Sequence, residues 1–152
     1  MVTRVERSQR LLRIIQRLDV RIDAAMELAA EVIATEARKN VQRSPRGGRT
    51  YEKYNPRRTH KASKAGESPA TDTGQLVRSI TTSVDYRAKT FKLIASAQIA
   101  PYARALEYGT ADGRIAARPF MRPALIAKRD KALEIMAKAV SKALQDARNG
   151  NI

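Results

Sequence analysis

Cysteine and tryptophan are absent from the sequence, and histidine occurs only once. Without cysteine the chain has no disulfide framework, no zinc–thiolate site and no thiol nucleophile. The single histidine, His60, has no carboxylate or second histidine beside it, so neither a metal site nor a Ser/His catalytic group is supported. We expect His60 to be a solvated loop residue, and we expect no metal, no cofactor and no enzymatic activity.

Long apolar runs and nucleotide-binding glycine patterns are also missing. No stretch approaches the roughly 18 apolar residues of a membrane span, because Arg, Asp or Glu interrupts every candidate. Arginines continue through Arg21, which excludes the apolar core of a secretory signal. Gly47-Gly48 and the glycines at 109 and 113 lack the spacing and flanking elements of a phosphate-binding loop. The sequence therefore predicts a soluble protein with no membrane partner.

Positive charge is abundant instead. The chain has 30 Lys and Arg against 15 Asp and Glu, a formal net charge of +15. Such a charge predicts attraction to polyanions such as nucleic acid or an acidic protein surface. At 152 residues the chain has an ordinary single-domain length, so residues 1–152 are expected to form one domain.

Two long segments, residues 8–41 and 123–148, have the periodicity of amphipathic helices. The apolar positions of the first are Leu11, Ile15, Leu18, Ile22, Ala25, Ala29, Val32 and Ile33. Those of the second are Leu125, Ala132, Leu133, Met136, Val140, Ala143 and Leu144, and we expect this face to pack against the sheet or the first helix.

Both segments also carry rows of like charge. The first has a basic row, Arg10, Arg13, Arg17 and Arg21, and an acidic row, Asp19, Asp23, Glu27 and Glu31. Either these rows are a solvated face, or they meet complementary rows on neighbouring subunits. In the second segment the lysines gather away from the apolar face with few acids to balance them, and we expect them to be free for an anionic partner. They are Lys128, Lys131, Lys138 and Lys142.

Residues 42–70 form a basic stretch that proline and glycine interrupt throughout. A long loop of this kind in a compact domain is usually functional or disordered, so we expect an arm that orders only in an assembly, or a disordered loop. Tyr51 and Tyr54 either stack on bases or hold an extended arm in β conformation. The candidate residues are Arg43, Arg46, Arg49, Tyr51, Lys53, Tyr54, Arg57, Arg58, Lys61 and Lys64.

Residues 71–100 predict a short helix followed by a β-hairpin. Asp72 or Thr73 is placed to cap a helix that contains Leu76, and Gly74 weakens it. Apolar residues then alternate with polar ones over 80–86 and again over 90–97, which gives a hairpin with one apolar face. A hairpin is marginal alone, so we expect it to pack on the helices and to pair with strands from residues 42–70.

Residues 101–122 hold a short helix and a constrained turn. Pro101 suits the first helical position, Gly109 supplies the positive φ that ends the helix, and Pro123 suits the first position of the helix that follows. Glu107 and Asp112 are close in sequence, and the neighbouring arginines at 104, 114 and 118 are their expected structural partners.

Two segments resemble a known family. The first is Tyr102, Ala103, Leu106, Glu107, Tyr108, Gly109, Thr110 followed by Ala117, Arg118, Pro119, Phe120, Met121, Arg122, Pro123, Ala124 and Leu125. The second is Gly66, Glu67, Pro69, Ala70, Thr71, Asp72, Thr73, Gly74, Leu76, Ser79 and Ile80. They are similar to the patterns of the small head–tail joining, tail-completion or tail-terminator proteins of long-tailed bacteriophages. The likeness covers residues 45–125.

The resemblance implies a structural virion protein at the phage neck, assembled in the bacterial host cytoplasm. Such proteins form a ring, usually a hexamer, that completes the tail and joins it to the head around the DNA channel. The implied partners are the tail tube, head-completion or connector proteins and the DNA. The motif residues that hold the fold or the subunit contact are Tyr102, Leu106, Glu107, Tyr108, Gly109, Thr110, Arg118, Pro119, Phe120 and Pro123. For Gly109, Pro119, Phe120 and Pro123 the backbone chemistry favours a role in the fold.

The overall expectation is an α+β domain with two long amphipathic helices packed on a small antiparallel sheet and a protruding basic arm. The alternative function is a free-standing basic nucleic-acid-binding protein of the chromatin or RNA-chaperone type, suggested by the +15 charge and the tyrosines of the arm. The sequence has no zinc-finger, basic-zipper or RNA-recognition motif to support that alternative.

Overall fold

The computed structural model describes residues 4–54 and 56–149. Its elements in chain order are α1 (Arg4–Gln42), β1 (Thr50–Tyr54), β2 (Arg57–Lys61), α2 (Gln75–Ser79), β3 (Ile80–Asp85), β4 (Thr90–Ala95), α3 (Ala103–Tyr108) and α4 (Met121–Arg148). The α+β class with two long helices and small antiparallel sheets is confirmed. No helix in the described part of the chain is long and apolar enough to cross a membrane.

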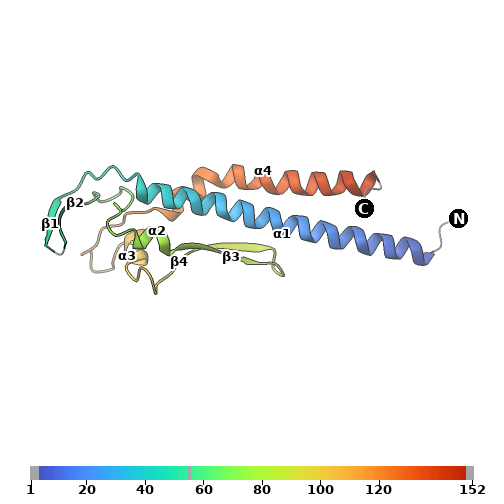
Figure 1. Ribbon diagram of the computed structural model, residues 1–152, viewed down its shortest axis with the longest axis horizontal. Helices are drawn as coiled ribbons and strands as arrows, with labels where there is room; N and C mark the ends of the chain where they lie inside the picture. Colours follow the sequence, from blue (N-terminus) through green and yellow to red (C-terminus); the bar gives the residue numbers. More distant parts are fainter. Residues whose placement is uncertain (1–3, 55, 150–152) are drawn as a thin grey trace.

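The two long helices lie side by side and run in opposite directions (Figure 1). Small side chains dominate the buried cluster that both helices share, which includes Ala29 of α1 and Ala124 and Ala132 of α4. Alanine lets two helix backbones approach closely and has little side-chain entropy to lose on burial. The helix α4 therefore packs mainly on α1.

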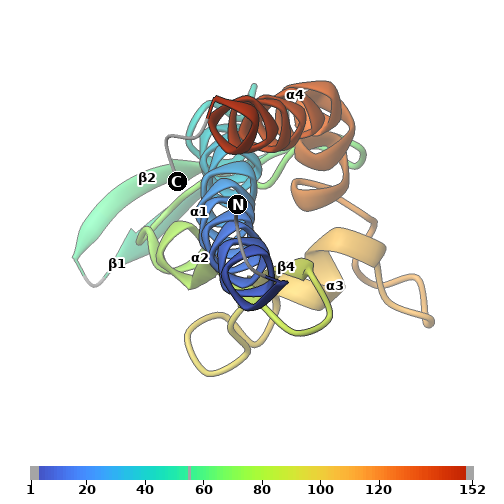
Figure 2. The ribbon, with the colours of Figure 1, turned by 90° about the vertical axis from the view of Figure 1, so that its right-hand side faces the viewer.

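The hairpin of β3 and β4 covers another side of α1 (Figures 1 and 2). The strands are antiparallel, with Ile80 opposite Ala95 and Val84 opposite Phe91. Their inward side chains join the cluster that contains Ile33 and the fully buried Phe120. Arg38 of α1 fixes the start of the hairpin by donating to the Ile80 carbonyl oxygen at 2.9 Å.

The expected pairing between this hairpin and residues 42–70 is wrong. Strands β1 and β2 pair only with each other, from Thr50 opposite Lys61 to Tyr54 opposite Arg57, and they form a separate two-stranded sheet. That sheet projects at the far end of α1 from the N-terminus (Figure 1). Residues 42–70 therefore contain a hairpin formed within the single chain, neither a disordered loop nor an arm that needs an assembly to order it.

Several helix ends differ from the expected ones. The helix α1 begins at Arg4, four residues before the expected start, and runs to Gln42. The helix α3 begins at Ala103, two residues after Pro101, and α4 begins at Met121, so Pro123 is its third residue. The residue that precedes α2 is Gly74, with φ of 77°, and the hydroxyl of the expected cap Thr73 accepts the N–H of Gln75, the first residue of the helix, at 3.4 Å. Gly109 does end α3 with a positive φ of 78°.

The expected apolar faces of both long helices are only partly buried. Ala25, Ala29 and Ile33 are in the core, but Leu11 and Ile15, which continue the same stripe toward the N-terminus, are exposed. In α4 the buried members are alanines, and the larger ones remain in solvent: Leu125, Leu133 and Leu144. In α4 alanines are therefore the buried residues, and Ile135 and Met136 pack only partly against the core.

The charged rows find partners within the chain. Lys89 in the β3–β4 turn pairs with Asp19 at 3.5 Å and Asp23 at 2.7 Å, and Tyr86 donates to Glu27. Together with the contact of Arg38 with Glu31, they give each member of the acidic row a partner within the chain.

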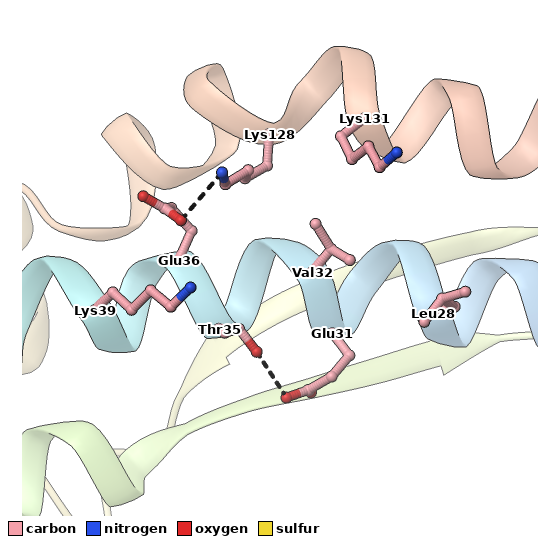
Figure 3. A pocket seen from close by; sticks show the side chains of 8 residues that line it. All are labelled: Leu28, Glu31, Val32, Thr35, Glu36, Lys39, Lys128 and Lys131. Carbon is pink, nitrogen blue, oxygen red and sulfur yellow. Dashed lines mark hydrogen bonds and ion pairs between the residues drawn. The ribbon is translucent and has the colours of Figure 1, made fainter.

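The expectation of a free lysine row on α4 is also wrong. Lys128 crosses to Glu36 of α1 at 3.3 Å beside an open groove between the helices (Figure 3). Lys131 and Lys138 both pair with Glu134, and these two ammonium groups lower the pKa of Glu134 to about 2. Three of the four lysines thus have a carboxylate partner, and the two carboxylates offset half of the charge of the row.

Candidate functional site

Glu107 is the central residue of the connection between α3 and α4. Its buried carboxylate accepts three backbone N–H bonds, from Phe120 at 2.8 Å, Met121 at 3.0 Å and Arg122 at 2.9 Å. Pro123, the next residue, has no N–H. The first turn of α4 is therefore fully satisfied, and a negative charge lies at the positive end of a 28-residue helix.

Glu107 and Asp112 were both expected to pair with a neighbouring arginine, and only Asp112 does so. Glu107 does not pair with an arginine, because its oxygens are taken by the backbone of α4. Asp112 does pair with Arg114, at 3.2 Å, and accepts the Arg114 N–H, and this local loop lowers the pKa of Asp112 through hydrogen bonds from Thr110 and the Arg114 backbone. Glu107 is thus a helix cap, and Asp112 shapes an exposed turn.

The loop from Gly109 to Pro119 is closed by its own backbone. Thr110 and Ile115 bond to each other, and Arg118 donates its N–H to the Leu106 carbonyl. A Cβ on Gly109 would lie 3.1 Å from the Ile115 oxygen in addition to the strain of its positive φ. Glycine is therefore required where this loop returns past the end of α3.

The two segments that resemble the phage family are in direct contact. Gly66 donates its N–H to the Ala117 carbonyl at 2.9 Å, and the Ser68 hydroxyl donates to the Pro119 carbonyl at 3.2 Å. Arg118 reaches from the first of these segments, residues 102–125, to the carbonyl of Ser63 at the base of the arm. We call this meeting point of residues 63–68 and 117–122 the junction.

A second carboxylate, that of Glu67, anchors the basic arm to the junction. Glu67 accepts the N–H groups of Lys64 and Gly47, at 2.8 and 2.9 Å, and these bonds lower the pKa of Glu67. Gly48 donates to the Ala62 carbonyl, and a Cβ at this glycine would fall 2.6 Å from the Ser63 oxygen. The two chains at the root of the hairpin can approach this closely only because Gly48 has no side chain.

One face of the β1–β2 hairpin is fastened to Asp72. Lys53 and Arg58, directly opposite each other in the register, both pair with this carboxylate, and His60 lies 3.7 Å from it. The hydrogen bond from Lys53, with the charge of Arg58, lowers the pKa of Asp72. His60 is thus mostly covered and next to a carboxylate, which corrects the expectation of a solvated loop residue.

The other face of the hairpin is open to solvent. Tyr54 and Arg57 are opposite each other there, with Lys61 on the same face, and Tyr54 is 78% exposed. Neither Arg57 nor Lys61 makes an ion pair within the described residues. The hairpin therefore presents Tyr54 and Arg57 at its tip and Lys61 at its root, with Glu52 and Thr59 between them on the same face.

The candidate residues differ in the contacts that they make within the chain. Lys53 and Arg58 are used inside the chain, and the β-conformation proposed for the tyrosines is correct for both, since Tyr51 and Tyr54 lie in β1. The cations that make no ion pair within the part of the chain that the structure describes are Arg43, Arg46, Arg49, Arg57, Lys61 and Lys64. The motif residues in the junction or the core beside it are Leu106, Glu107, Gly109, Thr110, Arg118, Pro119, Phe120 and Pro123.

Tyr102 and Tyr108 are the motif residues on the surface, with Tyr108 almost wholly exposed. The residues that the sequence did not single out as a site are Glu67 and Asp72. The sequence feature that could have identified them is that they are rare acids beside a basic stretch. An acid in that position has many cations and N–H groups to bind.

The fastening of the hairpin is expected to depend on pH. Because the pKa of Asp72 is lowered from 3.8 in the folded chain, its stabilisation is present above the unfolded pKa and is lost as pH falls through the folded value. We expect the NMR amide signals of residues 50–61 to keep their dispersion from pH 7 to about 4 and to lose it below. In Asp72→Asn, as a control, the dispersion should already be reduced at pH 7. Unchanged wild-type signals at pH 2 would contradict this role.

Comparison with known proteins gives no match: no family model fits the chain, and neither a curated protein nor a solved structure is significantly similar to it.

Proposed function

We propose that this protein is a structural component of the neck of a long-tailed phage or phage-like particle. In this proposal copies of the chain form a ring that completes the tail and joins it to the head around the DNA channel. The assembly takes place in the bacterial host cytoplasm, and the ring, hexameric in the related family, contacts the tail tube and the head-completion or connector proteins.

The observation that carries the proposal is the junction. The two segments that resemble the phage family bond to each other through residues that are 51 positions apart in sequence, Gly66 with Ala117 and Ser68 with Pro119. The residues that resemble the family pattern in sequence therefore also lie together in space. A basic hairpin projects from this junction, at the opposite end of the molecule from the N-terminus of α1 (Figure 1). A molecule with projections at both ends is suited to contacts between subunits in an assembly.

The outer face of the hairpin offers the test. Arg57→Ala with Lys61→Ala removes two unpaired cations and leaves the Asp72 contacts intact. Supplied to a phage that lacks its own copy of the gene, this variant should reduce infectious particles by roughly tenfold or more, as expected when central interface residues contribute about 1 kcal/mol each. Unjoined heads and tails should accumulate in electron micrographs.

The matched control is Arg87→Ala with Lys92→Ala, which removes the same charge from the exposed β3–β4 hairpin. This control should support normal joining. If the hairpin variant also joins heads to tails at the wild-type level, the proposed role of the arm is wrong.

The second candidate function is a free-standing nucleic-acid binder, and the exposed Tyr54 opposite Arg57, with Lys61 on the same face of the hairpin, is the observation in its favour. This function predicts tight binding to single-stranded DNA that weakens steeply with salt. The Arg57→Ala and Lys61→Ala changes should then lower the log–log salt slope by about two. Under the neck proposal the binding is weak and shows no sequence preference.

A further inference from the structure

The outer edge of β4 borders an apolar groove. The strand pairs with β3 alone, because their sheet has only these two strands. In Figure 2, β4, α3 and the first turns of α4 lie on the same side of α1. The groove is lined there by Phe91 and Leu93 of β4, Tyr108 of α3, Leu125 of α4 and Ile33 of α1. One side of this groove is therefore a strand edge, and its other sides are helices.

The backbone groups of Phe91 and Leu93 point out from that edge. The Ser96 N–H donates to the Ser79 carbonyl at 2.9 Å, and this pair continues the register of the two strands. In an antiparallel ladder such bonded pairs alternate with pairs whose N–H and C=O groups point away from the partner strand. Phe91 and Leu93 belong to the second kind. No turn, loop or side-chain hydrogen bond that the structure describes uses their backbone groups.

The edge of β3 is closed at its first residue in a way that the edge of β4 is not. The Ile80 N–H donates to the Val77 carbonyl, and the Ile80 carbonyl accepts from Arg38. The two donors and two acceptors of Phe91 and Leu93 instead match those of another extended chain. Such a chain would place alternate side chains in the groove.

The charges available at this groove are positive. Arg122 and Lys92 line it and are exposed, and neither makes an ion pair with any residue that the structure describes. The lining acid is Glu107, which is buried and accepts three N–H bonds. Asp130 follows Leu125 by five residues, about 140° round the helix, and does not line the groove. An occupant with carboxylates would therefore complement the groove.

We propose that the edge of β4 takes up an acidic, extended segment of a partner protein as a third strand. Alternate apolar side chains of that segment contact Ile33 and Leu125, and a carboxylate pairs with Arg122. A second copy of this chain is a poor source of the segment, because its own extended stretch, residues 43–64, contains many cations and a single acid, Glu52. The inference goes beyond the neck proposal and does not depend on it.

The test adds a capped peptide of alternating valine and glutamate, about eight residues long, to the purified full-length chain. We expect a Kd on the order of 0.1 mM. With bound peptide, the amide hydrogen exchange of Phe91 and Leu93 should slow by roughly tenfold or more. The amides of Thr82 and Val84 point to the far edge of β3, so their exchange should not change. A valine–lysine peptide of the same length should bind at least about tenfold more weakly.

Arg122→Gln tests the charge of the groove, and Arg129→Gln is the matched control. Both arginines are exposed on α4, but only Arg122 lines the groove. We expect the Arg122 variant to bind the valine–glutamate peptide about tenfold more weakly and the Arg129 variant to bind as the wild type does. The proposal is overturned if Phe91 and Leu93 gain no protection at about 1 mM peptide. It is also overturned if the lysine peptide binds as tightly, or if the two variants bind alike.

Discussion

Replacing Glu107 with alanine is expected to lower the free energy of unfolding by about 3 kcal/mol, since it leaves three N–H groups at the start of α4 without an acceptor in a buried site. The loss should be seen in urea unfolding followed by circular dichroism. Because Glu107 links α3, the 109–119 loop and α4, the whole junction should loosen with it.

Two variants make this result specific. Glu107→Gln keeps the size and one good acceptor but no charge, so we expect about half the loss of the alanine variant. Glu52→Ala removes an exposed acid of the arm and should change stability by no more than about 0.5 kcal/mol. A Glu107→Ala chain as stable as the Glu52→Ala chain would show that the cap does not hold the fold.

Replacing Phe120 with alanine is expected to cost about 3 to 5 kcal/mol, the usual range for a large side chain removed from a core. Phe120 has no exposed surface and packs in the cluster formed by α1, β3 and α4. It also sits directly before α4, so its loss leaves a cavity where that helix begins. Urea unfolding should show a much lower midpoint.

Tyr108→Ala is the matched control, because Tyr108 is an aromatic residue of the same motif but is 77% exposed. Its replacement should change the free energy of unfolding by less than about 0.5 kcal/mol. Equal losses at the two positions would contradict the distinction between fold-holding and surface members of the motif.

The fold class followed from periodicity, but the packing faces did not. The 3.6-residue pattern located both long helices to within a few residues. It could not show that α1 and α4 would meet through Ala29, Ala124 and Ala132, because a hydrophobic stripe of large residues dominates any such pattern.

Individual residues of the candidate site could be predicted from the sequence, but their hydrogen bonds and ion pairs could not. Gly109 could be placed by its need for a positive φ. The bonds of Glu107 could not, because its partners are backbone groups 13 to 15 residues away, and backbone N–H groups leave no mark on the sequence. In the same way, the pairing of Lys53 and Arg58 with Asp72 depends on a strand register that the charge pattern alone conceals.

The arm was misjudged because its composition outweighed its local pattern. Proline, glycine and charge indicate a loop, yet the hairpin needs little apolar surface of its own. The Glu67 bonds at its root and the Asp72 contacts along one face hold it in place. Glu67 and Asp72 are thus also acids that offset part of the positive charge of the arm.

The most direct test of the neck proposal is immunogold electron microscopy of phage-like particles from cells that carry this gene, with antibody raised against the full chain. The proposal predicts gold at the neck or at the head end of the tail. Particles without gold, together with recovery of the protein on nucleic acid, would contradict it and favour the nucleic-acid binder.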